Sequence, residues 1–209
     1  MNINEYQNYH ETKAHTSAEF PYNTYLCSIP LDFPGVPLHW HDELELVVIK
    51  RGQGFVSVDF DKRLVHSGDI IIIPPGCLHA IEQDDTFKME YENIIFKPDL
   101  LSSGANDLCM IQYIVPLLDG SLPIEYFLTP ALGSFEALSN CIRQIDLVCA
   151  DQTPGWQLAV KSSLFNFFFL LISESQKKNS LHLLQFKIFG ENENCFKIRR
   201  KSLYRKTND

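Results

Sequence analysis

Three histidines and one glutamate stand at spacings that suit a metal site or a polar ligand site. They are His39 and His41, two residues apart, Glu45 four residues later, and His79 in a second string. Three neutral imidazoles and one carboxylate suit a divalent transition metal such as Zn, Ni, Mn or Fe, at bond lengths near ~2.1 Å. Such a set leaves open positions for water or a ligand, whereas calcium, which prefers oxygen ligands, is not expected.

The alternation of side chains along a strand limits how these residues meet. His39 and His41 project from the same face of one strand. Glu45 has the same parity, but on a straight strand it would lie roughly 20 Å from His39 at ~3.4 Å per residue. The chain must therefore reverse, and residues 42–43 are the natural place, which puts Glu45 on the neighbouring strand. His79 then joins from a later strand.

Short β-rich runs broken by turn residues surround these positions between residues 22 and 96. The stretch Lys50–Gly54 supplies glycines for a turn between two strands, and Asp59–Lys62 can close a tight hairpin. This spacing indicates a β-barrel or sandwich. The predicted strands are 24–29, 38–41, 44–50, 54–60, 63–66, 70–74, 78–82 and 87–96.

The pattern changes after Pro98. Apolar residues spaced by three and four over 134–150 predict an amphipathic helix. A second helix is expected to begin with Thr153 as N-cap and Pro154 in its first turn, and to reach about Ser175. Because apolar residues surround most of its middle, this helix either wedges between the barrel and the first helix or forms an oligomer contact.

The two histidine strings resemble the signature motifs of the cupin superfamily over residues 35–83. Two positions depart from the pattern: the first glycine is two residues closer than usual to His39, and Gln83 stands where asparagine is usual. The resemblance implies a jelly-roll β-barrel, and neither departure touches a ligand position. The matching residues are Gly35, His39, His41, Glu45 and Gly52 in the first motif and Gly68, Pro74, Gly76 and His79 in the second.

Over about residues 10–178 the chain is similar to the N-terminal domain of AraC-type transcription regulators. The resemblance lies in His-Trp-His-Asp-Glu-Leu-Glu-Leu from His39, in Gly-Asp-Ile-Ile-Ile-Ile-Pro-Pro-Gly from Gly68, and in the helical hairpin after the barrel. It implies that the barrel binds a small effector, often a sugar, that an N-terminal arm reports its occupancy, and that the helices dimerise. The family reads DNA through a C-terminal pair of helix-turn-helix units of about a hundred residues, which the 31 residues after Lys178 cannot supply.

We therefore expect four parts: an N-terminal arm over 1–20, a cupin barrel over 21–100, a connecting segment with the dimerisation hairpin over 101–178, and a basic tail over 179–209. Residues 177–209 hold 9 basic and 3 acidic residues, a charge of +6, whereas residues 1–176 hold 9 and 23, a charge of −14. The tail could attract phosphates without reading bases, although solvated lysines at a chain end are commoner. We expect a disordered, truncated or frameshifted end.

Composition favours a soluble protein in a reducing compartment. Hydrophobic residues make up 45% of the chain and the net charge is −8. The six cysteines include no Cys-x-x-Cys pair, and the first residues do not resemble a signal sequence, so a cytoplasmic location is predicted. The most apolar stretch, 164–172, is shorter than the roughly 20 residues of a membrane-spanning helix, so no membrane span is expected.

Two classes of function fit these features. The favoured one is a sensing and dimerisation domain of a transcription regulator, a homodimer whose pocket binds a carbohydrate or small acid. His39, His41, Glu45 and His79 would line that pocket directly or through a metal. In the metal-free case Glu45 would be hydrogen-bonded to an imidazole. The alternative is a stand-alone metal-dependent cupin enzyme of the dioxygenase or sugar isomerase type. A third hypothesis has the chain dimerise with a full-length relative and block its DNA binding.

Other conspicuous side chains are expected to be structural. We expect His10 and His15 to lie on the surface of the arm. His66 is available as a general base for an enzyme, but we expect it to be a surface histidine at a strand end. Cys77 is expected to be a small buried side chain that fills space in the core, and Trp40 is expected to pack in the protein rather than stack on a ligand. No catalytic residue is therefore predicted.

Overall fold

The computed structural model describes residues 3–104 and 107–189, and the chain divides into two compact units. The first unit contains the residues up to 101 together with 126–139, and the second contains 102–125 and the residues from 140 onward. Most of the basic tail predicted for 179–209 lies outside the described residues.

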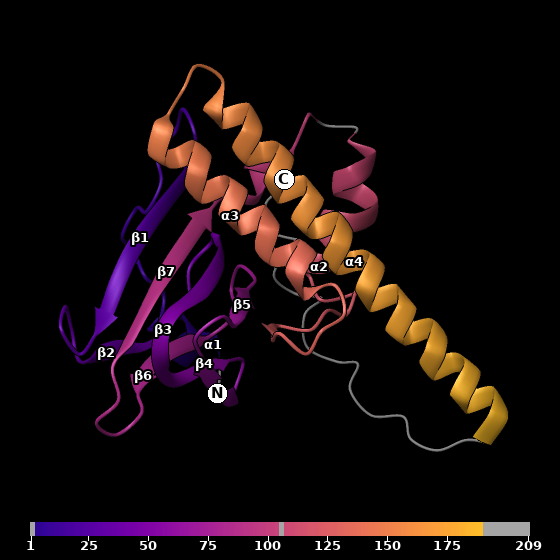
Figure 1. The fold of residues 1–209 in the computed structure, drawn as a ribbon, viewed down its shortest axis with the longest axis horizontal. Helices are drawn as coiled ribbons and strands as arrows, with labels where there is room; N and C mark the ends of the chain where they lie inside the picture. Colours follow the sequence, from indigo (N-terminus) through magenta and orange to yellow (C-terminus); the bar gives the residue numbers. More distant parts are fainter. Residues whose placement is uncertain (1–2, 105–106, 190–209) are drawn as a thin grey trace. The chain divides into compact units, whose positions relative to one another are not determined.

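The described part of the first unit forms eight antiparallel strands in two sheets (Figure 1). One sheet has the order β1-β7-β3-β5-β8, and in the other β2 pairs with β6, while β6 and β4 pair with β3. A mainly β, cupin-type barrel followed by two helices is thus confirmed. The strands are β1 (Tyr22–Ile29), β2 (Gly35–His39), β3 (Leu44–Val58), β4 (Asp61–His66), β5 (Ile70–Ile73), β6 (His79–Gln83), β7 (Met89–Phe96) and β8 (Phe127–Leu128).

Strand β3 is one strand of 15 residues, so the prediction of two strands separated by a turn at Lys50–Gly54 was wrong. Its first part pairs with β5 and β7, and its second part, from Gln53, pairs with β4 and β6. Gly52 has a φ of +77°, and a Cβ there would lie 1.8 Å from the Lys88 carbonyl oxygen. The glycine therefore lets β3 pass from one sheet to the other instead of ending it.

The other predicted turns are present. Asp59 and Phe60, with φ of 47° and 74°, form the two-residue connection between β3 and β4, a geometry that matches strand twist. Strand β5 ends at Ile73, directly before Pro74, and its four isoleucines are at most 1% exposed. Burial on both faces of this strand, which follows from its unbroken apolar sequence, is therefore confirmed.

An apolar cluster fills part of the barrel interior and fixes the strands that carry the polar residues. Its members from β3 and β5 are Val47, Ile49, Val56, Val58, Ile71 and Ile73, each at most 1% exposed. Interiors packed this tightly resist displacement of any one strand. The side chains that extend from the same strands beyond the cluster therefore have fixed positions.

The helices of the chain largely follow the prediction. Helix α3 spans Phe135–Asp151, one residue from the expected bounds. Helix α4 begins at Trp156, after a turn in which the Trp156 amide donates to the Thr153 carbonyl (2.9 Å), so the predicted start at Thr153 and Pro154 was wrong. It continues to Phe189, so the predicted end near Ser175 was also wrong, and the first part of the predicted tail is helical. The remaining helical elements are α1 (Ile3–Gln7), a 3₁₀ turn (Pro98–Leu101), a π-helix (Met110–Ile114) and α2 (Val115–Leu118).

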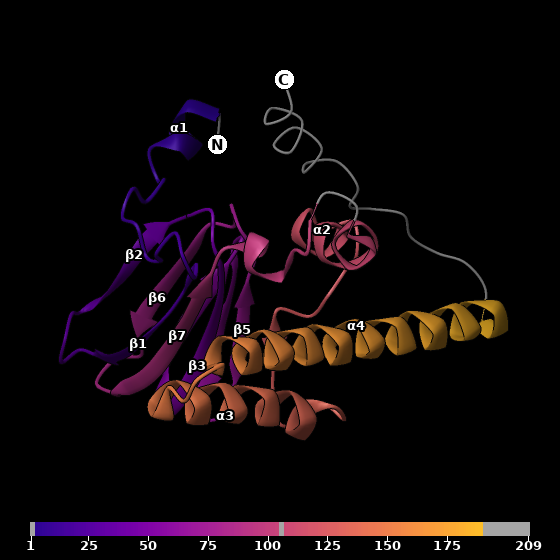
Figure 2. The ribbon, with the colours of Figure 1, turned by 90° about the horizontal axis from the view of Figure 1, so that it is seen from above.

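Within the second unit, α3 and α4 lie side by side as a hairpin (Figures 1 and 2). The Asn166 side chain of α4 donates a hydrogen bond to the Cys141 sulfur of α3 at 3.3 Å.

By length and mean hydropathy, Trp156–Lys177 could also span a membrane, which the sequence prediction did not anticipate. Helix α4 has a buried apolar side, a pattern also found in core helices of soluble proteins. The buried side consists of Val160, Leu164, Phe167, Phe168 and Leu171, each at most 2% exposed.

Candidate functional site

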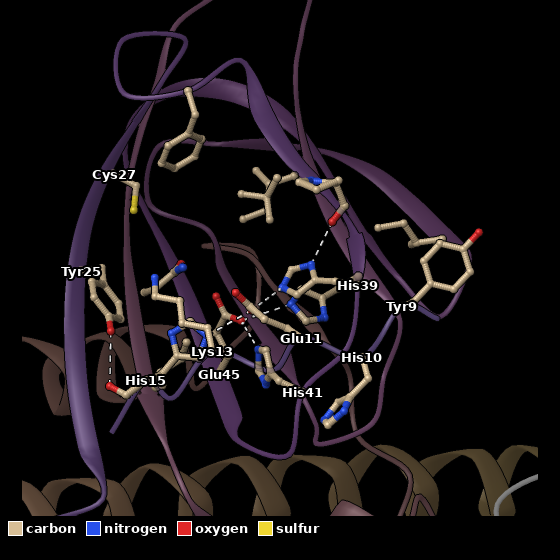
Figure 3. A pocket seen from close by; sticks show the side chains of 18 of the residues that line it. Tyr9, His10, Glu11, Lys13, His15, Tyr25, Cys27, His39, His41 and Glu45 are labelled. Carbon is tan, nitrogen blue, oxygen red and sulfur yellow. Dashed lines mark hydrogen bonds and ion pairs between the residues drawn. The ribbon is translucent and has the colours of Figure 1, made fainter. Parts of the chain in front are cut away.

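The four residues singled out in the sequence meet inside the barrel (Figure 3 labels three of them). One ligand atom from each of His39, His41 and His79 lies within 4.8 Å of the other two. The Glu45 Oε2 atom lies 3.0 Å from His41 Nε2 and 3.3 Å from His79 Nε2. All but His39 are nearly fully buried, at 1–3% side-chain exposure. The three imidazoles therefore form one cluster that could hold a metal ion, and Glu45 lies beside two of them.

The way the chain brings them together differs from the prediction. Strands β2 and β3 are not paired, because β2 pairs with β6, where His39 stands opposite His79. His41 lies in the connection after β2 that leads from one sheet to the other, and Glu45 lies near the start of β3. The predictions that His39 and His41 share one strand and that Glu45 sits on the neighbouring strand were therefore wrong. The site nevertheless forms because the barrel curls both sheets around one interior.

Backbone carbonyls orient all three imidazole rings. In each ring, Nδ1 lies within hydrogen-bond distance of a carbonyl oxygen two residues away in sequence. Donation from Nδ1–H to that carbonyl leaves the lone pair on Nε2, the nitrogen that faces the other imidazoles. Metal-binding histidines are commonly fixed in this way. The three contacts are His39 to Pro37 (2.9 Å), His41 to Glu43 (3.2 Å) and His79 to Cys77 (2.9 Å).

The contact between His41 and Glu45 needs a positive charge between them. An Nε2 lone pair facing a carboxylate oxygen at 3.0 Å is repulsive unless a proton or a cation lies between. Burial alone would lower the pKa of His41, but the hydrogen bond and charge of Glu45, with Glu43 and Glu11, raise it above its ordinary value. Burial likewise opposes ionisation of Glu45, yet the hydrogen bond from His41 and the nearby imidazole of His79 hold its pKa well below the usual range. Without a metal, the two form a buried ion pair.

His39 and His79 supply the other two nitrogen atoms of the cluster. Burial, and then the neighbouring His79, lower the pKa of His39. The Nε2 atom of His79 is buried, and within the described part of the chain it has no hydrogen bond of good geometry, since its contact to Glu45 is only an ion-pair distance of 3.3 Å. A buried polar atom without a partner is costly. A divalent transition metal fits this set, because it would supply that missing partner.

The site opens into a cavity of about 500 Å³, a size that suits a small molecule. Its walls combine apolar side chains such as Phe33, Val36 and Ile81 with polar ones from β1 and β7. Burial raises the pKa of the Tyr91 hydroxyl and of the Cys27 thiol, so both stay neutral at physiological pH. The pocket therefore offers neutral polar groups in addition to the imidazoles.

The N-terminal arm is attached to the barrel through Trp40. The Trp40 ring stacks with Tyr6 and His10, at centroid distances of 4.8 and 4.1 Å, and its Nε1–H donates to the Tyr6 carbonyl at 2.9 Å. On the backbone, the Trp40 amide donates to the Tyr9 carbonyl and the Glu11 amide to the Trp40 carbonyl, both at 2.9 Å. Trp40 is thus a packing residue, as predicted, and it fixes the arm segment (residues 6–15).

Two side chains of the arm segment enter the site, and the sequence analysis missed both roles. Glu11 Oε2 lies 3.1 Å from His15 Nε2 and 3.4 Å from His39 Nε2 (Figure 3). His15 is only 9% exposed and touches Tyr25 edge-on, so its prediction as arm surface was wrong. His10, half-buried against Trp40, departs from that prediction too. The spacing of four between Glu11 and His15 was the available signal.

Two minor predictions agree with the structure. His66 is exposed at the end of β4 and does not line the cavity, and Cys77 is a buried filler at 2% exposure. The general base considered for an enzyme is therefore absent from the pocket.

Comparison with known proteins supports the resemblance found in the motifs. A family model described as "AraC-like ligand binding domain" matches residues 25–168. The chain is 33% identical over 159 residues to an uncharacterized HTH-type transcriptional regulator, YdeC, of Bacillus subtilis, covering 76% of this chain and 54% of that protein. It is 32% identical over 69 residues to the HTH-type transcriptional activator RhaR of Mannheimia succiniciproducens, covering 33% of this chain and 24% of that protein.

Among solved structures, a cupin protein from Bacteroides fragilis is 24% identical, with a TM-score of 0.36, covering 42% of this chain and 80% of that one. The chain spans about half the length of YdeC and a smaller share of RhaR. The family match, in contrast, covers more than half of this chain and includes the barrel strands and most of the hairpin. The chain therefore belongs to the family of AraC-like ligand-binding domains.

Proposed function

We propose that this chain is the effector-binding domain of a transcription regulator, with the barrel cavity as the effector site. One observation carries the proposal: three imidazoles converge, with a carboxylate beside two of them, in a cavity large enough for a small molecule. The family and the regulators that it resembles give the biological setting. DNA binding is assigned to the whole regulator and not to this domain. We place it in the cytoplasm, where such regulators meet their DNA.

We further propose that His39, His41, His79 and Glu45 hold a divalent transition metal of the Zn, Ni, Mn or Fe type. When bound, the metal would act as a Lewis acid that attracts oxygen atoms of the effector. The chain's own residues do the rest: the backbone carbonyls orient the rings, and the apolar walls exclude water. An effector with adjacent oxygens, such as a carbohydrate or a small acid, fits this combination.

The hairpin of α3 and α4 is proposed as the homodimer contact. Three large apolar side chains on it remain solvent-exposed, Leu147 at 59%, Leu158 at 74% and Phe169 at 65%. Exposed apolar residues of this size commonly mark protein contacts. Sedimentation velocity should show a dimer that a Phe169→Ser change weakens, while the exposed polar residue Gln157 provides a control position.

Metal content and effector binding test the site directly. Elemental analysis of the purified chain should find about one transition metal per chain, and His79→Ala should lose it while the exposed-histidine control His66→Ala keeps it. Calorimetric titration with a panel of sugars and small acids should show binding without consumption of the ligand. Turnover of a ligand, abolished in His41→Ala, would instead favour the cupin enzyme.

A further inference from the structure

Two carboxylates, those of Glu45 and Glu11, approach the Nε2 atoms of the three imidazoles. Glu45 Oε2 approaches His41 and His79, whereas Glu11 Oε2 approaches the remaining ring, that of His39, at 3.4 Å. Each of the three Nε2 atoms thus has a carboxylate oxygen within 3.4 Å. The second carboxylate comes from the arm segment, outside the barrel strands (Figure 3).

The charge of this enlarged set matches a divalent cation. The two carboxylates carry a charge of −2 when ionised, and in the metal-free protein the charged His41 offsets only one of them. His79 Nε2, at 1% side-chain exposure, has no well-aligned partner among the described residues. A cation among the Nε2 atoms would neutralise both carboxylates and supply that partner.

Glu11 is held in position through both its backbone and its side chain. Its backbone amide is bonded to the Trp40 carbonyl, one residue from His39 and one from His41. Its carboxylate is held by His15, a nearly buried ring whose Nε2 lies 3.1 Å away. The side chain is therefore positioned before any ligand arrives, with only 29% of its surface exposed. Preorganisation of this kind is what a ligand residue requires.

We infer that Glu11 is an additional cation ligand supplied by the arm segment, so that metal binding fastens this segment to the barrel. The inference rests on the proposed metal site at His39, His41, His79 and Glu45, and it adds a link between cation occupancy and the closure of the cavity. Because residues 8–11, 13 and 15 line the cavity, fastening the arm segment also sets access to the effector site.

The chain carries two built-in reporters of this link. Trp40 stacks with Tyr6 and His10 of the arm segment, and Trp156 is the other tryptophan, so a Trp156→Phe variant isolates the Trp40 emission. Lys13 is exposed within the segment and offers trypsin a cleavage site. Zn²⁺, which is diamagnetic and does not quench fluorescence by itself, is the probe to add to chelator-stripped protein.

We expect Zn²⁺ to change the Trp40 emission saturably and to slow cleavage at Lys13 at least about tenfold. In Glu11→Gln the Zn²⁺ affinity should fall about 10- to 100-fold, the range seen when a supporting residue of a metal site is lost, and Lys13 should stay cleavable at saturating Zn²⁺. Glu19→Gln, a change at an exposed glutamate of the same arm, is the matched control and should behave like the parent chain. Circular dichroism checks the fold of both variants.

The possible outcomes distinguish the role of Glu11 from the existence of the four-residue metal site. Stoichiometric Zn²⁺ binding with unchanged Lys13 cleavage, or equal affinity in Glu11→Gln and the parent, overturns the role of Glu11 and leaves the four-residue site standing. Failure of the parent chain to bind Zn²⁺ overturns both. Loss of protection in Glu11→Gln alone, with Glu19→Gln unaffected, supports the inference.

Discussion

The candidate site has two halves that are built in opposite ways. The barrel half, with Glu45 and His79, is almost completely buried and rests on the apolar cluster of β3 and β5. The arm half, with Glu11, is partly exposed and is held by a few contacts to Trp40 and His15. Local stability follows buried apolar contact, so the arm half should open at a small free-energy cost and the barrel half only on unfolding. The barrel half can hold a ligand in place, while the arm half can open or close according to whether the ligand is bound.

The largest predicted effect is on the fixed half. Glu45→Gln removes the carboxylate from a buried pair and leaves the His41 charge without compensation, which should lower the free energy of unfolding of metal-free protein by about 3–5 kcal/mol. Urea unfolding in the presence of a chelator measures it. The matched control is Glu82→Gln, since the pair of Glu82 and Lys62 is about half exposed and should contribute less than about 1 kcal/mol. Equal losses in the two variants would contradict the buried pair.

The same pair predicts a pH dependence for the metal-free protein. The pKa of Glu45 is lowered, so its contribution is present above the unfolded value of 4.5 and is lost as pH falls through the folded pKa. The pKa of His41 is raised, so its contribution is present below the unfolded value of 6.5 and is lost as pH rises through the folded pKa. The stability difference between the parent and Glu45→Gln should therefore be greatest between these two values. A difference that stays flat from pH 4 to 9 would count against the ion pair.

The two halves also differ in how far the sequence predicted them. His39 and His79 were predictable because strand position and motif spacing both place them, whereas His41 was placed by motif spacing alone, since β2 ends at His39. The turn at Asp59 and Phe60 follows from local chemistry. The continuity of strand β3 could not be predicted, because a glycine is as compatible with a bend within a strand as with a turn between two strands. Only the pairing with partner strands decides between them.

The spacing of four between Glu11 and His15 was the one signal for their roles, and it was not sufficient, since the arm segment gains its structure from contacts to Trp40 that are distant in sequence. The bounds of α4 were missed although its apolar middle was evident from the sequence. A local turn between Thr153 and Trp156 displaced the start, and the helix continues past Ser175 to Phe189. Local patterns thus predict elements, while long-range contacts decide where an irregular segment lies.

An intermediate effect is expected within the arm half. His15→Ala removes the imidazole that holds Glu11 and the edge contact to Tyr25, so the arm segment should detach more often and trypsin should cleave at Lys13 several-fold faster. The loss in unfolding free energy should be about 1–2 kcal/mol, the typical cost of leaving a partly buried group unpaired. His66→Ala, at an exposed histidine, controls for imidazole removal. Unchanged cleavage at Lys13 would show that the contact to Glu11 does not hold the segment.

The smallest effect on global stability should come from Tyr6→Ala. Tyr6 stacks with Trp40 and donates a hydrogen bond to the Gly76 carbonyl, so its loss should speed cleavage at Lys13. Both contacts belong to the arm half, which detaches before the barrel unfolds. The free energy of unfolding measured with urea should therefore fall by less than about 1 kcal/mol. A loss as large as that of Glu45→Gln would mean that the arm segment unfolds together with the barrel. It would then be a structural part of the domain and unable to open by itself in response to a ligand.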